Sequence, residues 1–549
     1  MKKNYSVALL ALLLMMLVGA PVDAQRKKNF TLADTLSQAP ENWFNMDPQT
    51  DRVPGVSTER AYRELLSQKT PTEVIVAVID SGIDIEHEDL KDKIWVNTKE
   101  VAGNGIDDDN NGYVDDINGW NFIGGPNGEH VNYDTFELTR LYKQYHDKYE
   151  GKTAEEVADK HEFALYQQIK QEYEAERAEY EEQGSSFLQF YEQYSAARAQ
   201  LRAALGKDDI RMEDLDEFDP QTDELRVARG IVGFALSNNL TDEQIEEYND
   251  YLSRYLKYNL NPDFDPRHIV GDNYNNLQER SYGNALVEGP DAEHGTHVAG
   301  IVAANRQNEI GVEGVAAPVK IMVLRAVPNG DERDKDIANA IRYAVDNGAR
   351  VINMSFGKAY SPDKAVVDEA VRYASDKGVL LVHAAGNDGK NIDTENNYPT
   401  KRYLGTKGVA DNWLEVGASA WGSGNTFVGT FSNYGRKTVD IFAPGVDLYS
   451  TVPDSEYRSL SGTSMAAPVV SGIAALVMAY YPDLSAQQVR DIIMKSSVRY
   501  TKGRVNRPGE DPGSKEAETR FKKLSSTGGV ANAYYALQRA EKVSKRNKR

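Results

Sequence analysis

The sequence of 549 residues contains no cysteine, which excludes disulfide bonds, thiolate nucleophiles and zinc–thiolate sites. Positive charge is also scarce, because 63 Lys and Arg residues face 84 Asp and Glu residues and leave a net charge of −21. An acidic chain of this kind is a poor partner for nucleic acid and for anionic membranes. The hydrophobic fraction of 40% remains large enough for a sizeable core.

The sequence has no uninterrupted apolar run long enough for an ordinary membrane span, and residues 7–18 form an uninterrupted run of 12. Lys2 and Lys3 precede this run, and Val22-Asp23-Ala24 follows it as a tolerable cleavage site. Residues 1–24 therefore predict a secretory signal peptide, with an uncleaved anchor as the alternative. We expect an exported protein (periplasmic, cell surface or extracellular) with no membrane span after cleavage. Residues 25–70 are polar and irregular and predict an N-terminal arm.

Four continuous runs rich in β-branched residues predict strands that are buried on both faces, as in a parallel sheet. They cover residues 74–79, 319–324, 351–354 and 379–382. Helical patterns over 337–347 and 366–377 lie between them and end at Gly348 and Gly378. This alternation predicts an α/β fold with a central, mostly parallel sheet flanked by helices. Ligands of such folds bind at the carboxyl ends of strands, where Asp80 lies.

Residues 131–269 interrupt this alternation and predict a helical insertion. Phe163, Tyr166, Tyr173 and Tyr180 recur at helical spacing, and a second such pattern runs from 187 to 205. Thr241 and Gln244 form a candidate capping box for another helix. The many charges of the insertion fit either a solvated face or a recognition surface.

A serine follows a glycine turn in the run 462–468, directly before an apolar helical segment. Ser464 there would have an exposed hydroxyl in the positive field of a helix N-terminus, which suits a nucleophile that builds negative charge. The alternative is a helix N-cap. Two further runs favour the nucleophile, namely Asp80-Ser81-Gly82 and His294-Gly295-Thr296-His297.

These three runs, in the order Asp, His, Ser, resemble the signature segments of the subtilisin-like serine proteases (subtilases). The resemblance covers most of residues 71–130 and 270–540 and leaves the insertion unmatched. It implies a subtilisin-like layered fold with two catalytic segments, and the Lys and Arg residues of 541–549 predict a basic tail after them. It also implies a serine endopeptidase that acts on protein or peptide substrates.

The resemblance assigns Ser464 as the nucleophile, His294 as the general base and then acid, and Asp80 as the group that orients the histidine. Serine needs such a base because its hydroxyl is a poor nucleophile, and histidine titrates near neutral pH. The run 384–389 resembles the oxyanion-hole segment of the family and places Asn387 in that hole. His297 is left with a packing role.

The resemblance further implies that the segment Ser355, Phe356 and Gly357 binds the substrate main chain as an added strand and forms a wall of the S1 pocket. The next residue is Lys358, where close relatives usually have glycine. The sequence therefore does not predict the width of the S1 pocket. The opposing loop, 326–336, carries four acidic residues. We expect from them a mild preference for basic or polar residues upstream of the scissile bond.

Residues 107–115 match the first nine positions of an EF-hand calcium loop, with Gly112 at the turn. No glutamate stands at the twelfth position, which is Asn118, so Asp116 is a candidate to complete the site. A bare acidic turn is the alternative. The predicted ligands are Asp107, Asp109, Asn111, the carbonyl of Tyr113, and Asp115.

A second structural calcium site follows only from the family resemblance. Asp89 and Asn308 would supply side-chain oxygens, and Ile310 and Val312 backbone carbonyls. Calcium is thus the expected cofactor, and no organic cofactor is expected.

The sequence departs from many exported subtilases in the segment before the catalytic region. The 48 residues of 25–72 look too short and irregular for a folding-assisting pro-domain. Two rival functions stay open, a non-catalytic binding scaffold that uses the insertion and a ligase that transfers the acyl group to amines. The oligomeric state is not predicted.

Overall fold

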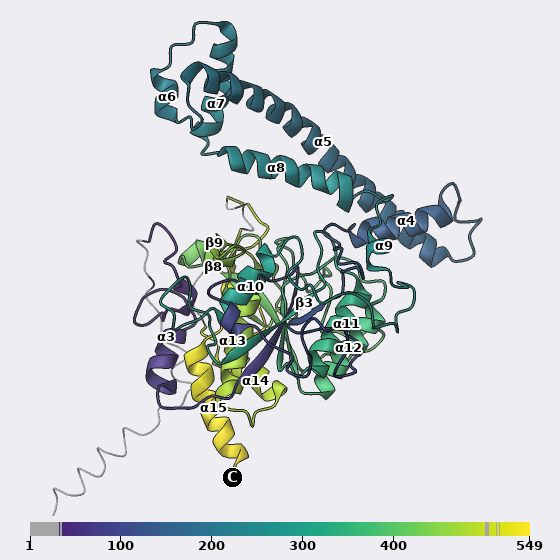
Figure 1. Cartoon of the computed structure of the whole chain (residues 1–549), viewed down its shortest axis with the longest axis vertical. Coiled ribbons are helices and arrows are strands. Elements are labelled where there is room, and N and C mark those ends of the chain that lie inside the picture. The colour runs from purple at the N-terminus through teal and green to yellow at the C-terminus, as the bar shows by residue number, and fades with distance from the viewer. Residues whose placement is uncertain (1–31, 33–35, 500–503, 512, 515–516) are drawn as a thin grey trace, which may run out of the picture. The chain divides into compact units, whose positions relative to one another are not determined.

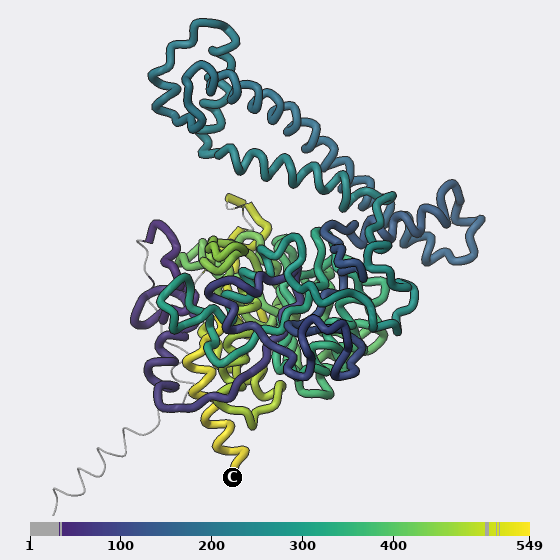
Figure 2. Tube along the Cα trace, viewed as in Figure 1, coloured from purple at the N-terminus to yellow at the C-terminus, as the bar shows by residue number. Residues whose placement is uncertain are grey.

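A computed structural model describes residues 32, 36–499, 504–511, 513–514 and 517–549. The chain forms two compact units: unit 1 is Met1–Asn132 with Arg267–Arg549, and unit 2 is Tyr133–Pro266. Figure 2 follows the chain as it leaves unit 1, builds unit 2 and returns. The signal peptide predicted over 1–24 lies outside the described residues.

Unit 1 is built on a seven-stranded sheet in which every neighbouring pair is parallel. The four predicted strands are confirmed within one or two residues, whereas the three others escaped prediction because their sequences are short or carry polar residues. In sheet order the strands are β2 (Gly119–Asn121), β3 (Val319–Arg325), β1 (Val74–Asp80), β4 (Val351–Met354), β5 (Leu380–Ala384), β6 (Trp413–Ser419) and β7 (Ile441–Pro444).

Helices cover both faces of this sheet (Figure 1). On one face lie α10 (Glu293–Ala303) and α13 (Thr463–Tyr480), and on the other α11 (Asp334–Asp346) and α12 (Lys364–Asp376). The side chains of β1 alternate between them: Val76 and Val78 join the α13 cluster, and Ala77 and Ile79 join the α11–α12 cluster. This two-sided burial explains the uninterrupted apolar run of β1.

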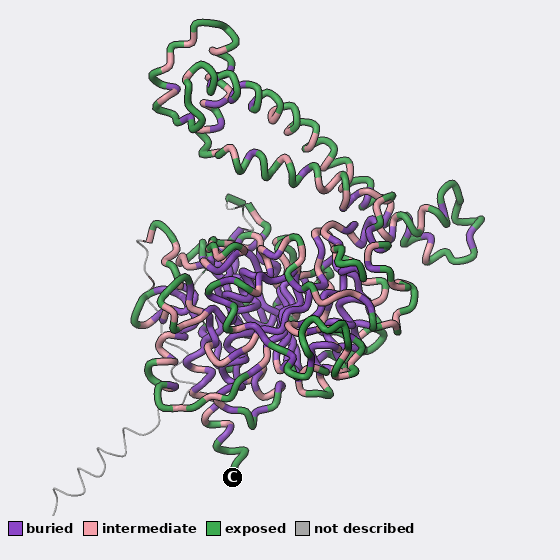
Figure 3. The backbone as a smooth tube through the Cα atoms, in the orientation of Figure 1, coloured by how far each residue is buried: buried purple, intermediate pink, exposed green. Residues whose placement is uncertain are grey.

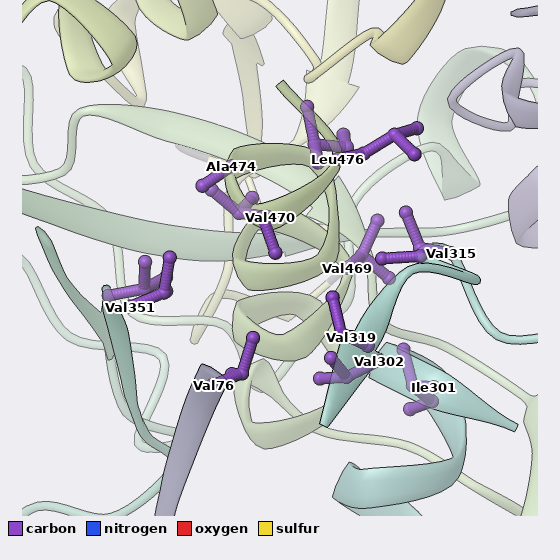
Figure 4. Close-up of a cluster of buried hydrophobic side chains, with 14 of the residues drawn as sticks. Val76, Ile301, Val302, Val315, Val319, Val351, Val469, Val470, Ala474 and Leu476 are labelled. Atoms are coloured by element: carbon purple, nitrogen blue, oxygen red, sulfur yellow. The ribbon is translucent and has the colours of Figure 1, made fainter. Parts of the chain in front are cut away.

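Helix α13 is the centre of the larger core. Figure 4 shows Val469, Val470, Ala474 and Leu476 pointing from it towards strands and helices around it. Each of the fully buried Val and Leu side chains contributes about 1.5–3 kcal/mol relative to an exposed one. Among the described residues α13 is the one helix long and apolar enough to cross a membrane, yet 89% of that window is buried inside this protein core.

The N-terminal arm enters the same core. Trp43 and Phe44 are fully buried in it, and the Trp43 indole N–H donates to the Asp447 carbonyl at 3.1 Å. Its elements are η1 (Trp43–Asn45), α3 (Thr58–Ala61) and the π-helical turn η2 (Tyr62–Leu66). The arm therefore contributes to the hydrophobic core of unit 1.

Smaller elements complete unit 1 around the sheet. Two antiparallel hairpins are β8 (Leu448–Val452) with β9 (Glu456–Leu460), and β10 (Arg504–Asn506) with β11 (Glu518–Arg520). The remaining helices and turns are η3 (Lys91–Lys93), α9 (Arg267–Val270), η5 (Gly424–Thr426), α14 (Ala486–Ser496), η6 (Phe521–Lys523) and α15 (Ala533–Asn547).

Unit 2 is helical, as its sequence patterns predict. The two aromatic patterns lie on one 46-residue helix, α5 (Lys160–Leu205), which runs antiparallel to α8 (Asp242–Arg254) in Figure 1. Thr241 and Gln244 form the predicted capping box of α8. The other elements are α4 (Glu137–Tyr149), α6 (Met212–Glu217), α7 (Asp223–Ser237) and the π-helical turn η4 (Tyr255–Asn259).

Two kinds of contact hold unit 2 together. Aromatic rings stack between its helices, with Tyr180 and Tyr255 centred 4.3 Å apart and Tyr142 and Tyr173 3.9 Å apart. A separate apolar cluster joins α5, α6, α7 and α8 around the fully buried Leu201. Figure 3 shows that buried residues are sparse along the rest of these helices, so stability in unit 2 is concentrated in few contacts.

Candidate active site

Asp80, His294 and Ser464 each stand at the end of an element that the sheet positions. Asp80 is the last residue of β1, His294 the second residue of α10, and Ser464 the second residue of α13. The His294 Nδ1 atom lies 2.6 Å from Asp80 Oδ1. The same Asp80 oxygen accepts the Ser81 N–H at 2.8 Å, which fixes the carboxylate at the carboxyl edge of the sheet.

The electrostatics of His294 favour a base that accepts a proton readily. Burial lowers its pKa, but the charge of Asp80 and the hydrogen bond to it outweigh burial, so the pKa lies above its ordinary value. The side chain is still 40% exposed. Because a carboxylate accepts only, Nδ1 carries the hydrogen in the neutral ring, and Nε2 is the basic nitrogen.

Ser464 does not act as a helix cap. The cap position of α13 is Gly462, and no side chain caps this helix end. The Ser464 hydroxyl donates instead to the Ser355 carbonyl at 3.1 Å. Its N–H is one of the first amide groups of the helix, which have no intrahelical acceptor. The predicted N-cap alternative is therefore wrong, and both the hydroxyl and the N–H of Ser464 can take part in chemistry.

The side-chain amide of Asn387 is oriented by Thr463. Its Oδ1 accepts the Thr463 N–H and the Thr463 hydroxyl, both at 2.9 Å, so Nδ2 is the outward donor. A Cβ atom at Gly462 would lie 3.6 Å from both Asn387 Nδ2 and the Ser464 nitrogen. Asn387 Nδ2 and the Ser464 N–H thus both lie near the same point beside Gly462, and two such donors are what stabilising an oxyanion requires.

A chain of buried hydrogen bonds supports the serine from behind, and no motif in the sequence points to it. Ser471 donates to Asn353 Oδ1 at 2.8 Å, and Asn353 Nδ2 donates to the Ser355 hydroxyl at 2.9 Å. The Ser355 hydroxyl in turn donates to the Ser464 carbonyl at 2.8 Å. This chain joins β4 to the first turn of α13 and holds the backbone of the serine.

His297 has the packing role that the family resemblance implies. It is fully buried, and its Nε2 lies 3.0 Å from the carbonyls of Leu448 and Arg458. Burial lowers its pKa to about 4, so the ring is neutral at physiological pH. A neutral Nε2–H donates to these carbonyls and ties α10 to the β8–β9 hairpin.

The predicted substrate segment continues β4 at the same edge. Ser355 is buried beside Ser464, and the ring of Phe356 packs edge-on against His383, with centroids 6.2 Å apart. A Cβ atom at Gly357 would meet Asn397 Oδ1 at 2.4 Å. A side chain at this position would therefore have to displace the side chain of Asn397.

Lys358 points into the protein rather than into open solvent. The side chain is buried, and its Nζ lies 2.9 Å from Asp334 Oδ1 and donates to the Glu332 carbonyl at 2.7 Å. Its backbone pairs with Tyr398 at 3.0 and 2.8 Å. The lysine therefore neutralises a buried carboxylate and joins two loops of the site.

The acidic loop 326–336 does not display its charges as the predicted substrate preference requires. Glu332, Asp334 and Asp336 are buried. Asp334 pairs with Lys358, and Asp336 pairs with Arg267 at 2.6 Å. Three of the four acids thus face inward and do not support the substrate preference, which stays a prediction. The reason is that buried carboxylates need partners, which distant parts of the chain supply here.

The loop at 107–115 gathers only some of its predicted calcium ligands. The carboxylates of Asp107 and Asp109 lie together with that of Glu100, each within 4.8 Å of the others. The Asn111 N–H donates to both aspartates, at 3.0 and 3.1 Å. Asp115 differs from the prediction, because its carboxylate accepts the N–H groups of residues 104 and 105 instead.

One further predicted role at this loop comes out differently, whereas the carbonyl of Tyr113 stays a predicted ligand. Asp116 does not complete the cluster, because its oxygens accept hydrogen bonds from Asn97, Asn111 and the Tyr343 hydroxyl. The side chain of Tyr113, whose carbonyl was the predicted ligand, packs against Trp120 at 5.0 Å between ring centroids. Glu100 was missed because it precedes the recognisable motif by seven positions.

The loop at 305–312 is organised around the buried carboxylate of Asp89. Asn305 N–H, Asn308 Nδ2 and Val312 N–H donate to it at 3.0, 2.8 and 3.2 Å. The structure thus brings Asp89, Asn308 and Val312 together, while the Ile310 side chain is exposed. Protein donors engage both Asp89 oxygens.

An acid–histidine pair and a serine at a helix N-terminus, all at the carboxyl edge of a parallel sheet, are the groups that a serine hydrolase needs. A sequence model of the subtilase family (Peptidase S8) matches residues 72–521. The chain belongs to the subtilase family of serine proteases.

Several curated relatives match over shorter segments. Subtilisin DY from Bacillus licheniformis is 40% identical over 222 residues, 39% of this chain and 75% of that protein. Thermitase from Thermoactinomyces vulgaris is 39% identical over 221 residues, 39% of this chain and 72% of that protein. A thermophilic serine proteinase of Bacillus sp. strain AK1 is 38% identical, and the match spans about half of it (48%) and 39% of this chain.

Among solved structures, a protease from Pseudoalteromonas arctica aligns over 47% of this chain and 78% of its own. It has 27% sequence identity and a TM-score of 0.37.

Proposed function

We propose that this chain is an exported endopeptidase that hydrolyses peptide bonds through an acyl-enzyme on Ser464. The observation that carries the proposal is the 2.6 Å contact between His294 Nδ1 and Asp80, together with the two N–H donors beside Ser464. Each of these groups matches one requirement of acyl transfer, namely a base, its orienting carboxylate, a nucleophile and an oxyanion site.

Acylation begins when Ser464 Oγ attacks the carbonyl carbon of the scissile peptide and its proton passes to His294 Nε2. The serine hydroxyl first leaves the Ser355 carbonyl, to which it donates here. The negative charge on the substrate oxygen is held by Asn387 Nδ2 and the Ser464 N–H. His294 then gives its proton to the departing nitrogen, the C–N bond breaks, and the amine product leaves.

Deacylation uses the same groups in reverse. A water molecule transfers a proton to His294 Nε2 and attacks the ester carbonyl. The ester C–O bond breaks, and the histidine returns the proton to Ser464 Oγ, which releases the carboxylic acid. Asp80 stabilises the imidazolium in both halves of the reaction, as the raised pKa of His294 supports.

Substrates in this proposal are extended peptides or unfolded protein segments. The residues after β4 would pair with the substrate main chain, and Ser355, Phe356 and Gly357 line that path. Phe356 and the backbone around Gly357 supply an apolar wall, whereas the charge of Lys358 is already neutralised by Asp334. This arrangement favours recognition of main chain and apolar side chains over recognition of charge.

Labelling with a fluorophosphonate tests the nucleophile directly. The purified chain should be labelled at Ser464, and Ser464→Ala should lose the label while keeping its circular dichroism spectrum. Hydrolysis of an unfolded protein such as casein should disappear in the same variant. A folded chain that takes no label would support the non-catalytic scaffold instead. Product analysis with an added amine separates hydrolysis from ligation, because a ligase would transfer most acyl groups to the amine.

Export and the second calcium site belong to the same proposal. Export rests on residues 1–24, and a shortened N-terminus in secreted material, read by mass spectrometry, would support it.

Calcium at Asp89 and Asn308 stays a prediction. Protein donors already engage both Asp89 oxygens. If calcium does not bind there, Asp89→Asn should change the melting temperature equally with and without calcium. If calcium does bind there, the two changes should differ.

A further inference from the structure

Three carboxylates meet in one small volume outside the catalytic centre. Glu100, Asp107 and Asp109 each offer an oxygen, and these oxygens all lie within 4.8 Å of one another. Calcium binds oxygen ligands at about 2.4 Å, so two ligands on opposite sides of one ion are separated by about twice that distance. A single calcium ion can therefore contact all three groups.

Glu100 provides an observation independent of the acidic cluster. The residue is only 8% exposed, and its Oε1 accepts the Asp109 N–H at 3.0 Å. Its Oε2 is buried and has no hydrogen-bond partner within the described part of the chain. A buried, unpaired carboxylate oxygen is strongly unfavourable, and a cation is the partner that would satisfy it.

The protein supplies little positive charge of its own to this cluster. Lys99 Nζ lies 3.9 Å from Asp109 Oδ2, but the lysine side chain is 69% exposed. Asn97 Nδ2 donates to the same oxygen at 3.3 Å, and the Asn111 and Gly112 N–H groups donate to Asp107. One solvated lysine and neutral donors do not compensate three carboxylates.

We propose that Glu100, Asp107 and Asp109 bind one calcium ion. The donors are all oxygens, which suits calcium and excludes a zinc site of the usual nitrogen and sulfur kind. The site differs from the linear motif, because Glu100 enters it from before the loop and Asp115 is turned away.

The ion would hold a loop that reaches the sheet and a helix. Asn97 contacts both Asp109 and Asp116, and Asp116 accepts the Tyr343 hydroxyl of α11. Residues 117–118 then lead into β2, the edge strand beside β3. Calcium at Glu100 would thus stabilise the contact between the edge of the sheet and α11, because Asn97 and Asp116 already link the site to Tyr343.

Calcium titration by calorimetry tests the site on the full chain in a Ser464→Ala background, which prevents self-digestion. After EDTA treatment and dialysis, the parent should show a binding event that Glu100→Gln weakens at least tenfold. Asp115→Asn is the matched control from the same loop and should leave that event unchanged. Equal isotherms for the parent and Glu100→Gln would overturn the proposal, as would an Asp115→Asn loss as large as the Glu100→Gln loss.

Thermal unfolding gives a second test, in which Glu100→Gln should lower the melting temperature in calcium and raise it in EDTA. A merely misfolded variant would not show this reversal. With excess calcium, the parent should melt at a higher temperature than Glu100→Gln. In EDTA, the order should reverse, because the variant removes one of three mutually repelling charges. A parent melting temperature that is the same in calcium and in EDTA contradicts the site.

Discussion

His294 Nδ1 lies 2.6 Å from Asp80 Oδ1, across 214 residues of sequence. The contact exists because β1 ends at the carboxyl edge of the sheet, where α10 begins. It raises the pKa of His294 against the opposing effect of burial, and it selects Nε2 as the basic nitrogen. The reactivity of Ser464 in the proposed mechanism depends on this pair.

Replacing Asp80 with asparagine should change both the rate and its pH dependence. Neutral His294 is the active form, so activity falls as pH drops through its pKa. Loss of the Asp80 charge lowers that pKa, and the acid limb of kcat/KM should move to lower pH while kcat falls by about 10⁴. The pH–rate profile of a fluorogenic peptide measures both. An unshifted acid limb would mean that another group sets it.

Removal of the proposed oxyanion donor, Asn387 Nδ2, should lower kcat with little change in KM. Asn387→Ala should lower kcat by about 10²–10³, the magnitude known for subtilisin, another member of this family. Thr463→Val keeps the donor but removes one of the bonds that orient it, so we expect a loss of about fivefold to tenfold. Equal losses in the two variants, or a loss confined to KM, would disprove the assignment of Asn387 Nδ2.

Ser355 is expected to act through the position of Ser464. Ser355→Ala removes the donor to the Ser464 carbonyl and leaves buried Asn353 Nδ2 without its acceptor, a cost of about 1–3 kcal/mol in unfolding free energy. Urea denaturation would measure this cost, and steady-state kinetics should show a fall in kcat larger than the rise in KM. Exposed Ser459→Ala is the control, with neither effect.

The burial of Glu332 should make the free energy of unfolding depend on pH in a way that is unrelated to catalysis. Burial raises its pKa to about 8, although the charge of Lys358 acts to lower it. The folded protein therefore keeps a proton that the unfolded chain releases, and this group makes the free energy of unfolding fall between about pH 4.5 and 8. Glu332→Gln should remove that part of the slope, a change of a few kcal/mol by pH 8. Parallel stability curves for the parent and variant, both in the Ser464→Ala background, would contradict this.

The two compact units should respond separately to a core mutation in unit 2. Leu201 is fully buried in the α5–α8 cluster, so Leu201→Ala should cost unit 2 about 2–5 kcal/mol. Limited trypsin digestion should then cut within 133–266 faster, while hydrolysis of a short peptide stays unchanged. The matched control is Leu188→Ala on the same helix, which is exposed. A parallel loss of peptide hydrolysis would show that the units do not behave independently.

Prediction from sequence succeeded where the signal is local. The strand around Val74–Asp80 is an apolar run whose character does not depend on its neighbours, and the Thr241–Gln244 capping box spans four residues. The predicted ends of the helices were off by a few residues, as for α11, whose first turn consists of buried charged residues. Those charges look like a solvated loop until Arg267 and Lys358 are known to pair with them.

The loop at 107–115, with its proposed calcium site, shows the limit most clearly. The motif identified Asp107 and Asp109 because their spacing is local, and the structure does bring them together. It could not identify Glu100, which the chain delivers from outside the pattern, nor could it show that Asp115 binds backbone N–H groups instead. Spacing along the chain fixes which residue types are available, but the backbone path decides where each carboxylate points.

The sequence by itself therefore determined the family and the parallel-sheet class, and it singled out Asp80, His294, Ser464 and Asn387 as the candidate catalytic residues, because these follow from short runs of residues. Tertiary structure alone decided the orientation of the Asn387 amide, the hydrogen-bond chain behind Ser464, the burial of the acidic loop and the place of Glu100. These features rest on contacts between residues that are far apart in the chain, and burial and pairing there depend on the packing of the whole unit.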